Sequence, residues 1–75
     1  MARLPLLSGR VLVKILSQIG YQIARQRGSH IRLENLLDKN KRAITIPNHK
    51  EIGRGLLRKI LRDAEIGWDE FENLL

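Results

Sequence analysis

The feature that most constrains the fold is a change in apolar spacing along the chain, from helical to alternating and back to helical. Between Ser8 and Gly20 the apolar residues recur at intervals of three and four, which is typical of one helix face. Apolar and polar residues then alternate in segments 21–27, 30–35 and 42–47, the pattern of strands with one buried face. Helical spacing returns after residue 56. The predicted fold class is therefore α+β, in the order α-β-β-β-α, with helices covering one face of an antiparallel sheet.

Residues that begin or end helices set the predicted boundaries. Ser8 is a suitable N-cap, and Gly20 stands where a left-handed residue would end the first helix. Gly67 is expected to end the second helix. Trp68 and Phe71 then fall three residues apart in a short closing helix, where core packing is a better interpretation than stacking on bases. The chain is expected to form one domain over residues 1–75, too small for a deep internal pocket.

The charge of the chain is unevenly distributed. Fourteen Lys and Arg stand against eight Asp and Glu, a net charge of +6. Residues 1–64 hold all fourteen cations and only four of the acids, so their net charge is +10. A body this basic repels itself unless it binds a polyanion, and nucleic acid is the usual one. The alternative is a solvated surface that charge keeps in solution.

Other features of the composition exclude several classes of protein. The chain has no cysteine, which rules out a disulfide framework and thiolate metal ligation. The two histidines, His30 and His49, fall in different predicted loops without a carboxylate cluster, so neither a metal site nor a cofactor is expected. No signal-peptide hydrophobic stretch or membrane-length apolar run is present. The protein is therefore expected in the cytoplasm, with no membrane partner.

The hairpin formed by the first two strands determines where His30 points. If the apolar residues of both strands share the buried face, the connecting loop must have an odd number of residues. A three-residue loop, 27–29, pairs Ile23 with Leu33 and places Gln26 opposite His30. In this register His30 faces away from the helices and is not a core histidine.

His30, Arg32 and Glu34 are predicted to stand on this open face, with Ala24 and Gln26 beside them. Arg25, Arg27 and Arg32 flank His30. An exposed histidine is ordinarily a surface residue without a function. One imidazole among phosphate-binding cations is nevertheless enough to catalyse RNA cleavage. The ribose 2′-hydroxyl is an internal nucleophile, so an enzyme need only deprotonate it and stabilise the charge on phosphorus. DNA lacks this hydroxyl and would normally require a metal-activated water.

At these residues the chain resembles a known family. The segments "LPLLSGRVLVKILSQIGY", "RQRGSHIRL", "TIPNH" and "GLLRKILRDAEI" are similar to successive segments of the HicA toxins, over about Leu4 to Phe71. The resemblance implies a double-stranded-RNA-binding-domain-like fold, ribosome-independent cleavage of mRNA and neutralisation by a HicB antitoxin. It assigns the catalytic role to the histidine of Gly-Ser-His, which is His30. The stretch "NHKEIGRGLL" departs from the family, whose members often have more glycine and a proline before this helix.

Further residues are candidates for contacts with RNA. The second helix carries Arg54, Arg58 and Arg62 at four-residue intervals with Lys59 beside them, a stripe that is either a solvated face or a phosphate-binding surface. His49 is either a structural loop residue or a general acid for the leaving 5′-oxygen. The predicted RNA-binding set is Arg25, Arg27, Gly28, Ser29, Arg32, Lys50, Arg54, Arg58, Lys59 and Arg62.

The sequence thus predicts a metal-independent mRNA endoribonuclease that acts as a toxin, with His30 as general base and His49 as the candidate general acid. Its predicted partners are mRNA and a HicB-like antitoxin that covers the active face. Two other classes of function stay open: a non-catalytic RNA-binding module of the same fold, and an interaction protein that docks its basic face on an acidic partner. Incubation with labelled mRNA in excess EDTA separates the enzyme, which cleaves, from the module, which only retains the RNA.

Overall fold

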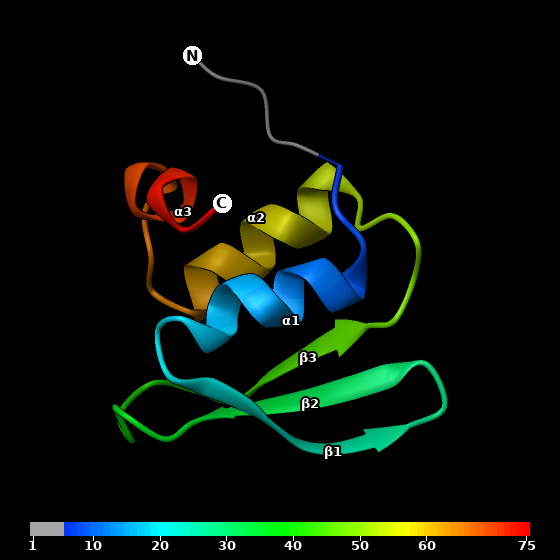
Figure 1. Cartoon of the computed structure of the whole chain (residues 1–75), viewed down its shortest axis with the longest axis horizontal. Coiled ribbons are helices and arrows are strands. Elements are labelled where there is room, and N and C mark those ends of the chain that lie inside the picture. Colours follow the sequence, from blue (N-terminus) through cyan, green and yellow to red (C-terminus); the bar gives the residue numbers. More distant parts are fainter. Residues whose placement is uncertain (1–5) are drawn as a thin grey trace.

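The computed structural model describes residues 6–75 and has two layers (Figure 1). One layer is a three-stranded antiparallel sheet in the order β1-β2-β3, and the other is formed by helices on one of its faces. Along the chain the elements are α1 (Gly9–Ser17), β1 (Tyr21–Arg27), β2 (His30–Asn35), β3 (Ile44–Pro47), α2 (Arg54–Asp63) and α3 (Trp68–Leu74). The predicted element order, sheet and closing helix are confirmed. No helix within residues 6–75 is long and apolar enough to cross a membrane.

Helix α1 begins where the sequence predicts, but it ends at Ser17, three residues before the left-handed Gly20 that was expected to end it. The Ser8 side chain accepts a hydrogen bond from the Val11 amide at 3.1 Å, which satisfies one free donor of the first turn. Gly20 has a φ of 101°, and a Cβ there would lie 2.7 Å from the Asn35 side-chain oxygen. Only glycine fits this position, because both the backbone conformation and the close approach exclude a side chain.

The hairpin differs from the predicted register at one point. Ile23 does pair with Leu33, but Arg27 pairs with His30 across a two-residue turn, Gly28-Ser29. The predicted three-residue loop is therefore wrong, as is the pairing of Gln26 with His30. A β-bulge between Ile23 and Arg25 supplies the extra residue that reconciles an even turn with the apolar alternation. Gly28 has a φ of 54°, as expected for glycine at the first central position of a type II′ turn.

The bulge changes which face the second half of β1 presents. Beyond it, Gln26 lies opposite the buried Ile31 and is on the helix side of the sheet, not on the open face as predicted. Ile23 is also on the helix side but is 48% exposed, because β1 is an edge strand that the helices only partly cover. Tyr21, at the start of the strand, is buried, and its hydroxyl donates a hydrogen bond to the Arg42 carbonyl at 3.0 Å.

The hydrophobic core lies between the sheet and the helices. Its buried members come from every element: Leu12, Ile15, Leu16, Tyr21, Ile31, Leu33, Ile44, Ile46, Ile52, Leu57, Ile60, Leu61, Ala64, Ile66 and Phe71. Trp68 packs against this cluster with its ring centroid 5.6 Å from that of Phe71, so the core interpretation of this aromatic pair is confirmed.

Two predicted boundaries are wrong. Strand β3 begins at Ile44 rather than Arg42, since the Arg42 carbonyl is used by Tyr21 and its side chain reaches Asp63 at 3.7 Å. Helix α2 ends at Asp63, because Glu65 turns the chain with a φ of 59°. Gly67 therefore does not end α2 but stands before the first residue of α3, at its N-cap.

Candidate functional site

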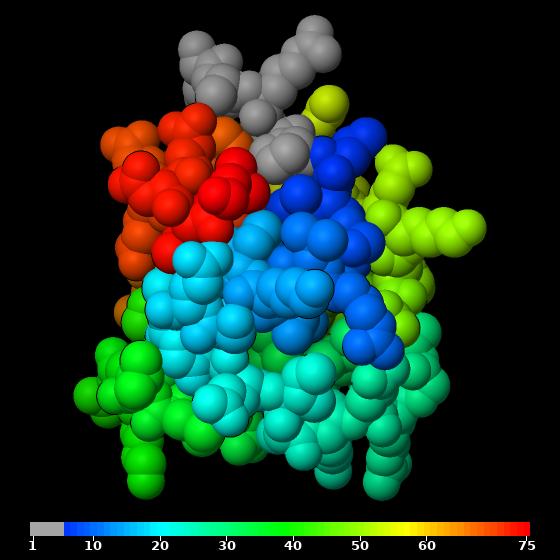
Figure 2. Space-filling view, in the orientation of Figure 1, coloured from blue at the N-terminus to red at the C-terminus, as the bar shows by residue number. Residues whose placement is uncertain are grey.

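The open face of the sheet, which the helices leave uncovered, carries a cluster of cationic side chains around His30. Arg25, Arg27, His30, Arg32 and Thr45 line a shallow hollow of about 180 Å³ on this face. Strand pairing explains the grouping, because Arg27 lies opposite His30, Arg25 opposite Arg32, and Arg32 opposite Thr45. All five residues are exposed. In Figure 2 this face is seen edge-on along the lower side of the molecule, where side chains of the hairpin extend away from the helices.

The β-bulge in β1 is what brings two of the arginines to this face. In an unbroken hairpin with Ile23 opposite Leu33, Arg25 would stand opposite the buried Ile31 and would project towards the helices. The extra residue, Ala24, reverses the alternation, so that Arg25 and Arg27 project on the same side as His30. The sequence predicts arginines that flank His30, but it does not predict the bulge that turns Arg25 and Arg27 to the same face.

The electrostatics of the open face favour an anionic ligand. Both ion pairs found within residues 6–75 involve Asp63, so none of the three arginines on this face has a carboxylate partner in the described part of the chain. Among residues 6–75, one side-chain hydrogen bond orders an arginine of this face, from Arg32 Nη1 to Thr45 Oγ1 at 3.4 Å. Because no carboxylate within residues 6–75 pairs with these guanidinium groups, most of their donors are available to phosphate oxygens.

The loop that carries His49 is attached to the end of the sheet where His30 lies. His30 pairs with Pro47, and the next amide, that of Asn48, donates a hydrogen bond to the Ser29 carbonyl at 2.6 Å. On its other side, the His49 carbonyl accepts a hydrogen bond from the Gly9 amide at 2.9 Å. These bonds hold the loop between the hairpin turn and the first turn of α1.

Position 9 requires glycine, because the loop passes close to the backbone there. A Cβ at this position would overlap the Pro47 carbonyl oxygen. The His49 and Lys50 side chains are exposed at this end of the molecule. The structure therefore brings the backbones of the two histidine-bearing segments together.

The cationic stripe on α2 lies on a different surface from His30. Arg54, Arg58 and Arg62 are exposed on the helical layer, whereas His30 is on the open face of the sheet. Lys59 donates a hydrogen bond to Asp63 at 3.0 Å, and this bond holds the pKa of the Asp63 carboxyl below its usual value. The structure thus separates the predicted RNA-binding residues into two groups, one on the open face and one on α2. The N-terminal end of α2 is the part of the second group that lies near the His49 loop.

A family model described as "HicA toxin of bacterial toxin-antitoxin" matches residues 9–66. This match runs from the first residue of α1 past the end of α2 and includes all three strands. The chain belongs to the HicA family. Comparisons with curated proteins and with solved structures give no match. As a HicA-family member, the protein is a toxin of a toxin–antitoxin system and has an antitoxin partner.

Two components of the site in this HicA-family toxin were not found from the sequence. No sequence motif marks the bulge directly. The Gly-Ser pair favours a two-residue turn, whereas the alternation of apolar residues in the two strands requires a loop with an odd number of residues, and a bulge in one strand resolves this conflict. Thr45 was assigned only to a strand, and its place opposite Arg32 follows from the register of β3. Within residues 6–75 no three His, Cys, Asp or Glu residues form a group that could hold a metal ion.

Proposed function

We propose that this HicA-family toxin is an endoribonuclease that cleaves mRNA without a metal ion, with His30 as the general base. The observation that carries the proposal is the position of His30 in a hollow with Arg25, Arg27 and Arg32 on the open face of the sheet. An imidazole can accept a proton near neutral pH, and guanidinium groups bind phosphate oxygens in pairs. The hollow is shallow, which suits a single phosphate of an extended strand better than a small molecule.

In the proposed reaction the imidazole of His30 removes the proton of a ribose 2′-hydroxyl. The 2′-oxygen forms a bond to the adjacent phosphorus, and the bond from phosphorus to the 5′-oxygen breaks. The arginines stabilise the negative charge that develops on the phosphoryl oxygens. The products are a 2′,3′-cyclic phosphate on one fragment and a 5′-hydroxyl on the other.

The departing 5′-oxygen must take a proton, and His49 is the proposed donor. Its loop is attached to the hairpin turn by the hydrogen bond from the Asn48 amide to the Ser29 carbonyl. His49 itself is two residues after Pro47, the cross-strand partner of His30. Lys50 and Arg54 follow His49 along the chain, are exposed, and would bind neighbouring phosphates. Gly28 has open space where a Cβ would stand, which leaves room for the RNA backbone at the turn.

The antitoxin partner is proposed to be a HicB-like protein that covers the open face. Carboxylates facing Arg25 and Arg27 would neutralise the cations and exclude RNA from His30 at once. Because mRNA is the proposed substrate, the cytoplasm is the compartment in which we expect the toxin to act.

Incubation of the purified protein with end-labelled mRNA in excess EDTA tests this proposal. Cleavage that persists in EDTA, with fragments ending in cyclic phosphate and 5′-hydroxyl by mass spectrometry, is the expected result. A 5′-phosphate product or loss of activity with the chelator would indicate metal-assisted attack by water instead. Retention of intact RNA would identify a non-catalytic RNA-binding module.

A further inference from the structure

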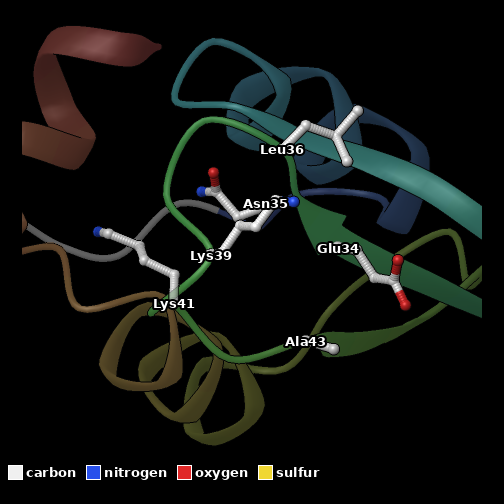
Figure 3. Close-up of a pocket in the computed structure, with 6 residues that line it drawn as sticks. All are labelled: Glu34, Asn35, Leu36, Lys39, Lys41 and Ala43. Atoms are coloured by element: carbon white, nitrogen blue, oxygen red, sulfur yellow. The ribbon is translucent and has the colours of Figure 1, made fainter.

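A second pocket lies on the sheet beyond the arginine cluster, at the other end of β2 (Figure 3). It has a volume of about 390 Å³, within the range of about 300–1,000 Å³ that is usual for small-ligand pockets. Its lining is formed by Glu34, Asn35, Leu36, Lys39, Lys41 and Ala43. The pocket is open to solvent, so it could receive a group that belongs to a longer chain.

Glu34 gives this pocket its chemical character. It alternates with Arg32 along β2 and therefore leaves the sheet on the same open face as His30. Within residues 6–75, no hydrogen bond or ion pair uses its carboxylate. Asn35, by contrast, is buried and fully engaged with backbone groups, so its amide is not available to a ligand.

The two lysines of the pocket have different roles. Lys41 donates a hydrogen bond to the Ala64 carbonyl at 2.7 Å, and Figure 3 shows its side chain pointing away from Glu34. Lys39 is exposed on the lining. A strand of RNA along the open face would therefore meet arginines near His30, then the carboxylate of Glu34, and then the ammonium group of Lys39. In Figure 2, side chains of the loop before β3 and of the hairpin extend at the two ends of this lower face.

A free carboxylate on a phosphate-binding surface repels phosphate. If it contributes to RNA binding, it must therefore contact another part of the nucleotide, such as the base. Bases of single-stranded RNA are read through hydrogen bonds to their Watson–Crick edges. A carboxylate accepts two parallel hydrogen bonds, and guanine is the base whose Watson–Crick edge offers two adjacent donors, N1–H and the 2-amino group. Ala43 contributes only a methyl group to the lining, which leaves room for a planar ring.

From this arrangement, and resting on the proposed ribonuclease function, we infer that Glu34 is a specificity-determining residue that binds a guanine near the cleaved bond. Glu34 lies four positions along the strand from His30, a span of roughly 13 Å at the usual rise per residue. The guanine therefore lies within a few nucleotides of the cut. Lys39 would hold the phosphate on its far side.

The experiment compares the wild-type protein with Glu34→Gln and with Glu72→Gln. Glu72 is exposed on α3, in the helical layer, so this control makes the same change in net charge away from the open face. Each protein first cleaves an RNA with a randomised segment, and sequencing of the fragment ends gives the base preference around the cut. Matched oligonucleotides then carry guanine, inosine or 7-deazaguanine at the preferred position. Inosine lacks the 2-amino group, whereas 7-deazaguanine keeps both Watson–Crick donors.

We expect the wild-type protein and Glu72→Gln to prefer guanine at one fixed position, and to cleave the inosine substrate about tenfold to a hundredfold more slowly. The 7-deazaguanine substrate should be cleaved like guanine. Glu34→Gln should treat guanine and inosine alike. If Glu34→Gln keeps the wild-type preference, or cleaves all substrates faster by one common factor, the inference is wrong and Glu34 only limits RNA affinity.

Binding measurements separate this inference from the proposed function. Uncleavable 2′-deoxy-substituted oligonucleotides that carry a single guanine or a single inosine are bound to each protein. A wild-type protein that cleaves nothing, yet binds guanine more tightly in a Glu34-dependent way, would contradict the ribonuclease function and support guanine recognition. Cleavage without any difference in binding or rate between guanine and inosine would support the ribonuclease function and contradict guanine recognition by Glu34.

Discussion

Arg27 and His30 are cross-strand partners at the end of the β1–β2 hairpin, and their side chains project from the same uncovered face of the sheet. The pairing depends on the bulge at Ala24, which shifts Arg25 and Arg27 to this face while Ile23 stays opposite Leu33. A small change in backbone geometry thus concentrates three guanidinium groups around one imidazole. The predictions below follow from this concentration.

The first prediction compares the two cationic surfaces. One double variant carries Arg25→Glu and Arg27→Glu on the open face. The other carries Arg58→Glu and Arg62→Glu on α2, and the two variants change the net charge equally. We expect the open-face variant to lose most of its affinity for uncleavable RNA, with the salt dependence of binding reduced by about two phosphate contacts. The α2 variant should bind RNA nearly as tightly as the wild-type protein. Equal losses would show that RNA binding depends on the overall charge rather than on the open face.

The second prediction concerns the antitoxin. If the antitoxin covers the open face, RNA and antitoxin compete, and the Arg25→Glu, Arg27→Glu variant should associate with antitoxin more slowly than the wild-type protein. This effect should shrink as salt concentration rises, because exposed charges are screened. Association rates at two salt concentrations provide the measurement. Unchanged antitoxin binding, together with weakened RNA binding, would place the antitoxin on another surface.

The third prediction uses two glycines with opposite surroundings. Gly9→Ala would force a methyl group against the Pro47 carbonyl and should cost about 1–3 kcal/mol of folding free energy. Gly55, in the first turn of α2, has open space where a Cβ would stand, so Gly55→Ala should be neutral or stabilising by up to about 1 kcal/mol. Urea denaturation of both variants measures the difference. A harmless Gly9→Ala would mean that the His49 loop does not pass so close to α1.

The fourth prediction concerns stability at alkaline pH. Burial, followed by the charge of Glu65, raises the pKa of Tyr21 above its usual value of about 10. The folded protein therefore holds this proton more tightly than the unfolded chain does. The resulting stability is fully present below the unfolded pKa and is lost as the pH rises through the folded pKa.

Tyr21→Phe tests this linkage. At neutral pH the variant should be less stable by about 1 kcal/mol, because the Arg42 carbonyl loses its hydrogen bond. Above about pH 10 the difference between the two proteins should narrow, because the phenylalanine has no proton to lose. Denaturation at pH 7 and at successive alkaline values provides the comparison. A difference that stays constant with pH would contradict a raised pKa.

The sequence was sufficient to predict the elements and the face on which His30 lies, because apolar periodicity reports which side of each strand is buried. It was not sufficient to predict the bulge, since alternating residues fit an odd loop as well as an even turn with one extra residue in the strand. For the same reason Gln26 was assigned to the wrong face. The end of α2 was also mispredicted, because Glu65 adopts a left-handed conformation that is usually reserved for glycine.

Thr45 and the pocket at Glu34 show a second limit. The place of Thr45 depends on the register of the β2–β3 pair, and the sequence contains no turn of defined geometry there to fix it. The pocket depends on the path of the loop between β2 and β3, which supplies most of its lining. The roles of His30 and His49 are proposals that rest on where the backbone holds them. Kinetics is the means of testing those roles.

The most direct test of the central claim is single-turnover cleavage of labelled mRNA in excess EDTA by the wild-type protein and by His30→Ala. His30 is exposed, so its replacement creates no cavity and should change stability by only about 0.5 kcal/mol, which a denaturation curve verifies. We expect the folded variant to bind RNA but to cleave it about a hundredfold to ten-thousandfold more slowly. A folded His30→Ala protein that cleaves at the wild-type rate would contradict the assignment of His30 as general base.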